Sequence, residues 1–173
     1  MEVKLKELTE KDGRDIYEML QEIVSGENGF QNNAYGINYQ QYKEYLAENV
    51  DMANGIGLKP EYVPQTIYWF YIDGKPVGLG KLRHYLNDTL RKMGGHIAYA
   101  IRPDERGKGY GKILLAELLK KAADKDIKKV LLTCDDDNYA SRKVIEENDG
   151  KLEEIDDGEC KYWIDMVYDS TER

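Results

Sequence analysis

The sequence contains only two cysteines, Cys134 and Cys160, and only two histidines, His84 and His96. The cysteines lack the paired spacing of a zinc site and two histidines cannot complete one, so we expect neither a metal centre nor a disulfide framework. No apolar run approaches the roughly 20 residues needed to cross a bilayer. Residues 1–6 have neither a long apolar segment nor a cleavage site, so we expect no secretion signal and a cytoplasmic protein.

Basic residues are also outnumbered: 25 lysines and arginines stand against 33 aspartates and glutamates, which gives a formal net charge of −8. Such a balance opposes attraction to a phosphate backbone or an anionic membrane, so we expect no nucleic-acid and no membrane partner. The length of 173 residues suits one domain, and no linker or repeat divides it. We therefore expect a single domain over residues 1–173.

Apolar periodicity predicts both helices and strands. The expected helices begin at an N-cap near Thr9 and run to about residue 24, then cover about 42–50, 111–122 and 139–147. The expected strands are 2–8, 66–72, 76–82, 95–102, 129–134 and 160–168, and Asp73-Gly74 joins two of them in a hairpin. The order strand, helix, strand over 95–134 predicts a parallel crossover unit, so the fold class is α/β with a mixed sheet.

The most informative stretch is a loop between an expected strand and an expected helix. Gly107, Gly109 and Gly111 occupy three of five positions, so successive backbone N–H groups can point at one anion beside a helix N-terminus. Arg106, Lys108 and Lys112 add positive charge in an otherwise acidic chain. The pattern favours a pyrophosphate site over the alternative of a simple tight turn.

Two other nucleotide-binding motifs do not match the spacing of this stretch. A Walker A loop would need glycine where Arg106 stands and serine or threonine where Ile113 stands. The dinucleotide fingerprint GxGxxG would need glycine at Lys112 or Leu114. ATP and NAD are therefore disfavoured as ligands.

The loop resembles motif A of the GNAT N-acetyltransferase superfamily, [Q/R]xxGx[G/A], met here as Arg106, Gly109 and Gly111 with Pro103 upstream. The resemblance extends to Asn138 and the segment after it, and covers about residues 95–155. The longer run GGHIAYAIRPDERGKGYGKILL, residues 94–115, also resembles a subgroup of bacterial predicted acetyltransferases. The resemblance implies a V-splayed mixed sheet flanked by helices, and direct transfer of acetyl from acetyl-CoA, as co-substrate, to a primary amine of a small molecule or protein. Homodimers are frequent among relatives, but nothing in this sequence specifies one.

The resemblance also implies roles for particular residues. The backbone of Tyr99, Ala100 and Ile101 would bind the pantetheine arm. The pyrophosphate would lie against the loop residues Arg106, Gly107, Lys108, Gly109, Tyr110, Gly111 and Lys112. Asn138 would contact the pantetheine amides, with Ser141 and Arg142 beside it, although asparagine is also a common helix cap. Separately from the resemblance, the segments 25–38, 54–66 and 83–94 have no other evident purpose, so we expect the acceptor pocket to come mainly from residues 25–94, with Phe30, Tyr35, Trp69, Arg83 and His84 as wall candidates.

The usual catalytic groups of the family are absent from their positions, because Ile145 stands where many relatives have a tyrosine acid and Thr133 where some have a glutamate base. His96 has a suitable intrinsic pKa for a base but could equally be an ordinary residue of its strand. Tyr99 could face the acceptor, although a tyrosine in a central strand is more often a packing residue. Cys134 and the acidic run 135–137 also end a strand near the expected thioester. Because these two positions lack the family's acid and base, a non-catalytic acyl-CoA-binding or sensor domain is the alternative function.

Overall fold

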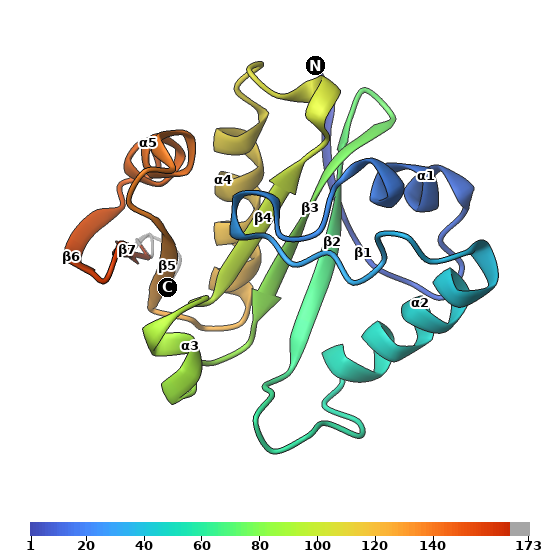
Figure 1. Cartoon of the computed structure of the whole chain (residues 1–173), viewed down its shortest axis with the longest axis horizontal. Coiled ribbons are helices and arrows are strands. Elements are labelled where there is room, and N and C mark those ends of the chain that lie inside the picture. The colour runs from blue at the N-terminus through green and yellow to red at the C-terminus, as the bar shows by residue number, and fades with distance from the viewer. Residues whose placement is uncertain (167–173) are drawn as a thin grey trace, which may run out of the picture.

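The computed structural model describes residues 1–166 (Figure 1). Here α marks α-helices, η short 3-10 helices and β strands. The elements are, in chain order, β1 (Val3–Glu7), α1 (Arg14–Glu22), η1 (Glu27–Gly29), α2 (Tyr39–Ala53), β2 (Gln65–Ile72), β3 (Lys75–Arg83), α3 (Asp88–Lys92), β4 (Ile97–Ile101), η2 (Pro103–Glu105), α4 (Tyr110–Asp124), β5 (Lys129–Asp135), α5 (Tyr139–Glu146), β6 (Lys151–Asp156) and β7 (Glu159–Asp165). Among these, no helix is both long and apolar enough to span a membrane.

The strands form two sheets, one in the order β1-β2-β3-β4 and one in the order β5-β7-β6. The sheets meet where the amide of His96 donates to the carbonyl of Leu131 at 2.8 Å. Gly95 permits this approach, because a Cβ atom there would lie 2.3 Å from the Leu131 carbonyl oxygen. Beyond this junction β4 and β5 diverge, and the cleft between them is the central feature of the fold.

The predicted α/β architecture with a V-shaped sheet is confirmed, with one qualification about strand pairing. All hydrogen-bonded strand pairs within residues 1–166 are antiparallel. The crossover through α4 does connect β4 to β5, but these two strands splay apart instead of forming the parallel ladder expected from the sequence. Their backbone groups at the open end are therefore available to a ligand.

Helices cover the larger sheet on both faces (Figure 1). On one face α1 and α2 bury an apolar cluster that includes Met19, Leu46 and Trp69. On the other face α4 packs against β3 and β4. Gly80 allows close packing there, since a Cβ atom at that position would lie 2.5 Å from the Leu118 side chain.

The first helix begins later than predicted. Gly13, not Thr9, is the N-cap of α1, and the helix ends at Glu22. The Thr9 amide instead donates to the carboxylate of Asp12 at 2.8 Å, which closes a turn. The same carboxylate accepts a hydrogen bond from Trp69 Nε1 at 2.6 Å. Asp12 therefore anchors the turn to the core and does not belong to the first helical turn.

The other elements differ in smaller ways. The hairpin of β2 and β3 turns at Asp73-Gly74 as predicted. α2 starts at Tyr39, earlier than its apolar pattern, because Asn38 and Gln41 form a capping box. Helix α3 and the exposed strand β6 were not predicted. The last strand, predicted over 160–168, is β7 and ends at Asp165, and positions 167 and 168 lie outside the described residues.

Candidate functional site

The cleft between the diverging sheets contains two adjoining cavities, of about 390 Å³ and about 170 Å³. Both are lined by Asn28, Phe30, Tyr99 and Ser141, so they are neighbours that share one wall. Asn28 and Phe30 come from the loop after α1, which the sequence assigned to the acceptor side. The arrangement suits two ligands that meet near Tyr99.

The larger cavity gathers most of the residues that the sequence assigned to the cofactor. Eleven of these residues line it: Tyr99, Ala100, Ile101, Arg106, Gly107, Gly109, Tyr110, Gly111, Lys112, Asn138 and Ser141. Two others, Lys108 and Arg142, do not. Lys108 Nζ contacts Glu105 at 2.8 Å, and Arg142 Nε donates to the Tyr162 hydroxyl at 3.0 Å. These two cations serve to hold the walls of the cavity in place.

The glycine loop has the conformation of an anion-binding site. Gly107 and Gly109 have φ values of 78° and 81°, which side chains rarely adopt, and nothing lies within 4 Å of a Cβ atom added at either. The amides of Gly107, Lys108 and Gly109 donate to no protein acceptor in the described part of the chain. They precede the first turn of α4, whose own N–H groups lack helical partners. The loop can therefore surround a phosphate with backbone donors.

Two acidic residues fix this loop. Glu105 is buried and pairs with Lys75 at 2.6 Å and with Lys108 at 2.8 Å. Hydrogen bonds from Lys108 and Lys75 lower the pKa of Glu105 to about 2. Arg106 Nη1 contacts Glu27 at 2.6 Å, and that hydrogen bond lowers the pKa of Glu27. The loop is thereby tied both to the β2–β3 hairpin and to η1.

Asn138 begins the second wall of the larger cavity. Its side chain caps α5, because Oδ1 accepts a hydrogen bond from the Ser141 amide at 3.2 Å. Both residues also line the cavity. The two interpretations of Asn138 that the sequence allowed, as a helix cap and as a cavity residue, are thus compatible.

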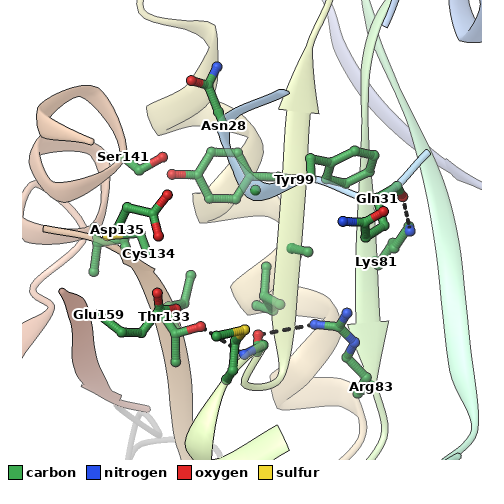
Figure 2. Close-up of a pocket in the computed structure, with 18 residues that line it drawn as sticks. Asn28, Gln31, Lys81, Arg83, Tyr99, Thr133, Cys134, Asp135, Ser141 and Glu159 are labelled. Carbon is green, nitrogen blue, oxygen red and sulfur yellow. Dashed lines mark hydrogen bonds between the residues drawn. The ribbon is translucent and has the colours of Figure 1, made fainter. Parts of the chain in front are cut away.

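The smaller cavity has walls of opposite charge (Figure 2). Asp135 and Glu159, from β5 and β7, lie on one side together with Thr133. Lys81 and Arg83, from β3, lie on the other side, and Tyr99 projects between the two groups. The cavity can therefore accommodate a ligand that carries both charges.

Asp135 and Glu159 face each other in the antiparallel register of β5 and β7. Burial raises the pKa of Glu159 above its usual range, and the neighbouring carboxylate of Asp135 adds to the shift while a hydrogen bond with Thr133 opposes it. Sequence analysis did not identify Glu159, because its pairing with Asp135 depends on β7 inserting between β5 and β6.

Tyr99 occupies the junction of the two cavities. Its hydroxyl is buried and has no hydrogen-bond partner among the described residues, although Ser141 faces it (Figure 2). Burial raises the pKa of Tyr99 to about 12, so the phenol stays protonated at neutral pH. A buried hydroxyl without a partner is unusual, and here it can donate to a bound ligand.

His96 lies at the junction of the sheets and lines neither cavity. Its Nδ1 accepts a hydrogen bond from the Leu131 amide at 2.9 Å. Burial, with Arg83 and Arg91 nearby, lowers the pKa of His96 to about 4, so the ring is neutral at pH 7. The geometry gives His96 a structural position and does not bring it to an acceptor.

The remaining candidates lie in the smaller cavity, in the core or, for Tyr35, at the exposed surface. Phe30, Arg83, Thr133, Cys134 and Ile145 line the smaller cavity. Tyr35 and Trp69 do not line it, and Trp69 is fully buried. His84 Nε2 instead lies 2.7 Å from the Thr66 hydroxyl. Burial raises the pKa of Cys134 to about 12, which keeps the thiol protonated and a poor nucleophile.

Splayed sheets with an open glycine loop and two adjoining cavities suit an enzyme that brings two ligands together. A family model described as "Acetyltransferase (GNAT) family" matches residues 30–150, which is more than half of the chain. The chain therefore belongs to the GNAT acetyltransferase family, and it is an acyltransferase enzyme.

Several solved structures share this fold. The chain is similar to the Campylobacter jejuni N-acetyltransferase PseH in complex with acetyl coenzyme A (TM-score 0.65, 12% identity, covering 96% of this chain and 100% of that one). It is also similar to the Microcin C7 self immunity acetyltransferase MccE in complex with acetyl-CoA and AMP (TM-score 0.67, 17% identity, covering 95% of this chain and 93% of that one). A third similar structure is a Salmonella typhimurium acetyl transferase that modifies the N-terminal serine of ribosomal protein L7/L12 (TM-score 0.64, 15% identity, covering 95% of this chain and 95% of that one). A sequence search of curated proteins finds no match.

Proposed function

We propose that this enzyme transfers an acetyl group from acetyl-CoA directly to a primary amine. The observation that carries the proposal is the pair of adjoining cavities, one lined by the glycine loop and the other by paired carboxylates, with Tyr99 at their junction. Structural neighbours that contain acetyl-CoA support the choice of acyl donor. The activity of the family supports acetyl as the group transferred.

The larger cavity fits the donor. The free amides of Gly107, Lys108 and Gly109 suit a pyrophosphate, and Lys112 adds a cation that pairs with no carboxylate in the described residues. The divergence of β4 from β5 leaves the backbone of β4 free along the path that a pantetheine arm would take. Asn138 and Ser141 form the opposite wall. These residues would hold the donor with its thioester near Tyr99.

The acceptor must lose a proton before it reacts. An alkyl ammonium with a pKa of about 10.4 is only about one thousandth neutral near pH 7.4, a shortfall of about 4 kcal/mol. We assign the base to Glu159, because its carboxylate lines the small cavity and its raised pKa makes it a better proton acceptor than an ordinary glutamate. Asp135 beside it would attract the ammonium form.

The transfer step then follows. The amine nitrogen attacks the thioester carbonyl carbon, so that a C–N bond forms and the C–S bond breaks. Starting from an ammonium, the nitrogen loses two protons, of which one ends on the departing thiolate and one reaches solvent through Glu159. We assign Tyr99 as the hydrogen-bond donor to the negative charge that develops, since its hydroxyl is protonated and lacks another partner. Cys134 takes no part, and no acyl-enzyme forms.

The sequence also allowed a non-catalytic acyl-CoA sensor, an alternative that rests on one observation: Ile145 and Thr133 occupy the positions where relatives carry the usual acid and base, and both line the small cavity. A sensor would bind acetyl-CoA without releasing thiol when amines are added. Calorimetric titration with acetyl-CoA, ATP and NAD, followed by thiol-release assays on a panel of amines, separates the two functions. Absence of acetyl-CoA binding would reject both.

A matched pair of variants tests the loop itself. Gly109→Asp adds a side chain and a negative charge at the proposed pyrophosphate site, and we expect it to raise the acetyl-CoA Kd at least about tenfold, equivalent to about 1.4 kcal/mol. Gly74→Asp is the control, since Gly74 has a similar φ of 80° and equally open surroundings in the β2–β3 hairpin. Equal affinities in the two variants would contradict the assignment.

A further inference from the structure

The small cavity has two cations for which the described residues supply no carboxylate. Lys81 is only 8% exposed, and its ammonium donates to the Gln31 carbonyl and lies 4.7 Å from the centre of the Phe30 ring. Arg83 donates to the amide oxygen of Gln65 at 3.1 Å and to the Gly94 carbonyl at 3.0 Å. Each has neutral acceptors only, which is unusual for a buried lysine and a half-buried arginine in a protein with net charge −8.

The two cations lie on one side of one strand. Lys81 and Arg83 are two residues apart on β3, so their side chains project from the same face. Burial lowers the pKa of Lys81 to about 8, and the charge of Arg83 contributes to that shift. Lys81 remains mostly charged at neutral pH. An anion bound between the two cations would relieve both their mutual repulsion and their lack of a counter-charge.

The carboxylates of the same cavity lie on the opposite wall (Figure 2). A ligand that spans the cavity therefore meets Asp135 and Glu159 at one end and Lys81 and Arg83 at the other. The volume of about 170 Å³ is small: it is comparable to the engineered cavity of about 150 Å³ that accommodates benzene. The part of the acceptor that lies between the two walls is thus compact.

We propose that the acceptor is a small amino carboxylate, whose amine lies against Asp135 and Glu159 and whose carboxylate lies against Lys81 and Arg83. This inference rests on the proposed acetyl transfer and specifies its acceptor. A polyamine would place a second cation against Lys81 and Arg83, at an electrostatic cost. A protein N-terminus carries an amide in place of the free carboxylate and would leave both cations unpaired.

The first experiment compares acceptors that differ in the anionic group alone. Each of a panel of α- and ω-amino acids is assayed by thiol release beside its amide and its decarboxylated amine, at fixed acetyl-CoA. We expect at least one amino acid to exceed its amide in kcat/KM by about 30-fold or more, the size of effect found for truncation of one partner of a buried charge pair. An amine phosphate of similar size tests whether the anion is a carboxylate.

Variants of Lys81 and Arg83 give a second readout. Lys81→Met keeps nearly the length of the side chain but removes the charge, and Arg83→Gln replaces the charged guanidinium by a shorter, neutral amide. We expect each to reduce the ratio of kcat/KM for the amino acid to that for its amide by about tenfold or more. The control is Lys59→Met, an exposed lysine outside both cavities, which should leave the ratio unchanged. An unchanged Kd for acetyl-CoA shows that each variant is folded.

The outcomes separate this inference from the proposed function. Equal or better use of amides, polyamines or amine phosphates overturns the amino carboxylate and leaves acetyl transfer standing. Binding of acetyl-CoA with no acetylation of any amino acid overturns it too. Failure to bind acetyl-CoA rejects the proposed function itself. A carboxylate preference that Lys81→Met and Arg83→Gln both abolish supports the assignment.

Discussion

His96 and Leu131 exchange two hydrogen bonds at the junction of the two sheets. The His96 amide donates to the Leu131 carbonyl at 2.8 Å, and the Leu131 amide donates to His96 Nδ1 at 2.9 Å. The imidazole thus satisfies a buried backbone N–H that the diverging strands leave without a ladder partner. This contact fixes the narrow end of the cleft and occupies the nitrogen that a general base would need.

His96→Phe tests this structural role. The variant keeps an aromatic ring but leaves the Leu131 amide unsatisfied, so we expect a loss of about 1–3 kcal/mol in the free energy of unfolding at pH 7.5. The folded pKa of His96, about 4, lies below its ordinary value of 6.5. The wild type therefore loses stability as the pH falls from about 6.5 towards 4, whereas the variant lacks that component. Denaturant titrations at pH 7.5 and pH 5 measure both effects, and identical pH dependence of the two proteins would contradict the pKa direction.

Tyr99→Phe separates catalysis from stability. The hydroxyl has no partner in the described structure, so its removal should leave the free energy of unfolding unchanged or slightly higher. We expect kcat to fall about 100-fold, the usual effect of removing one donor to a developing negative charge. Tyr45→Phe, in α2 and outside both cavities, is the control. A Tyr99→Phe enzyme with full kcat would remove Tyr99 from the mechanism.

The dependence of kcat/KM on pH tests the proposed role of Glu159 as the base. Glu159 must be deprotonated to accept a proton, and its pKa is raised above 4.5, so kcat/KM should fall as the pH drops through that raised value. Asp135→Asn removes a like charge beside Glu159 and should move this acidic limb to lower pH. Glu159→Gln should lower kcat by about 100-fold or more. Asp51→Asn, at an exposed position of α2 outside both cavities, should leave the profile unchanged, and an upward shift in Asp135→Asn would contradict the coupling.

Glu105 stabilises the glycine loop in a pH-dependent manner. Its pKa, about 2 in the folded protein, lies below the usual value of 4.5, so its contribution is complete above about pH 4.5 and is lost as the pH falls towards 2. Glu105→Gln should destabilise the protein by about 1–3 kcal/mol at pH 7, and by less at pH 3. Denaturation midpoints at the two pH values check the sign. A larger difference at pH 3 would contradict it.

The local parts of the site could be predicted from the sequence. The glycines at 107 and 109 predict backbone with positive φ, and Gly107 and Gly109 both have positive φ in the structure. The hairpin at Asp73-Gly74 follows from the same logic of turn residues. These features depend on neighbours in the chain, so a short window of sequence carries the information.

The non-local parts could not be predicted. Glu159 meets Asp135 only because β7 pairs between β5 and β6, an order that no short pattern specifies. The alternation of Leu79, Lys81 and Arg83 did offer a signal, since two cations share the face of a buried leucine. Their cavity exists only because the loop at Phe30 covers that face, which is a tertiary contact.

Gly95 limits how this sequence can drift during evolution. Its φ of +62° disfavours any side chain, and a Cβ atom would lie 2.3 Å from the Leu131 carbonyl oxygen. Both obstacles concern the folded chain and neither concerns a substrate. Relatives with entirely different acceptors should therefore retain glycine here. At Gly107 and Gly109 only the positive φ opposes a side chain, so a descendant that has lost its acyl donor should tolerate substitution there better than at Gly95.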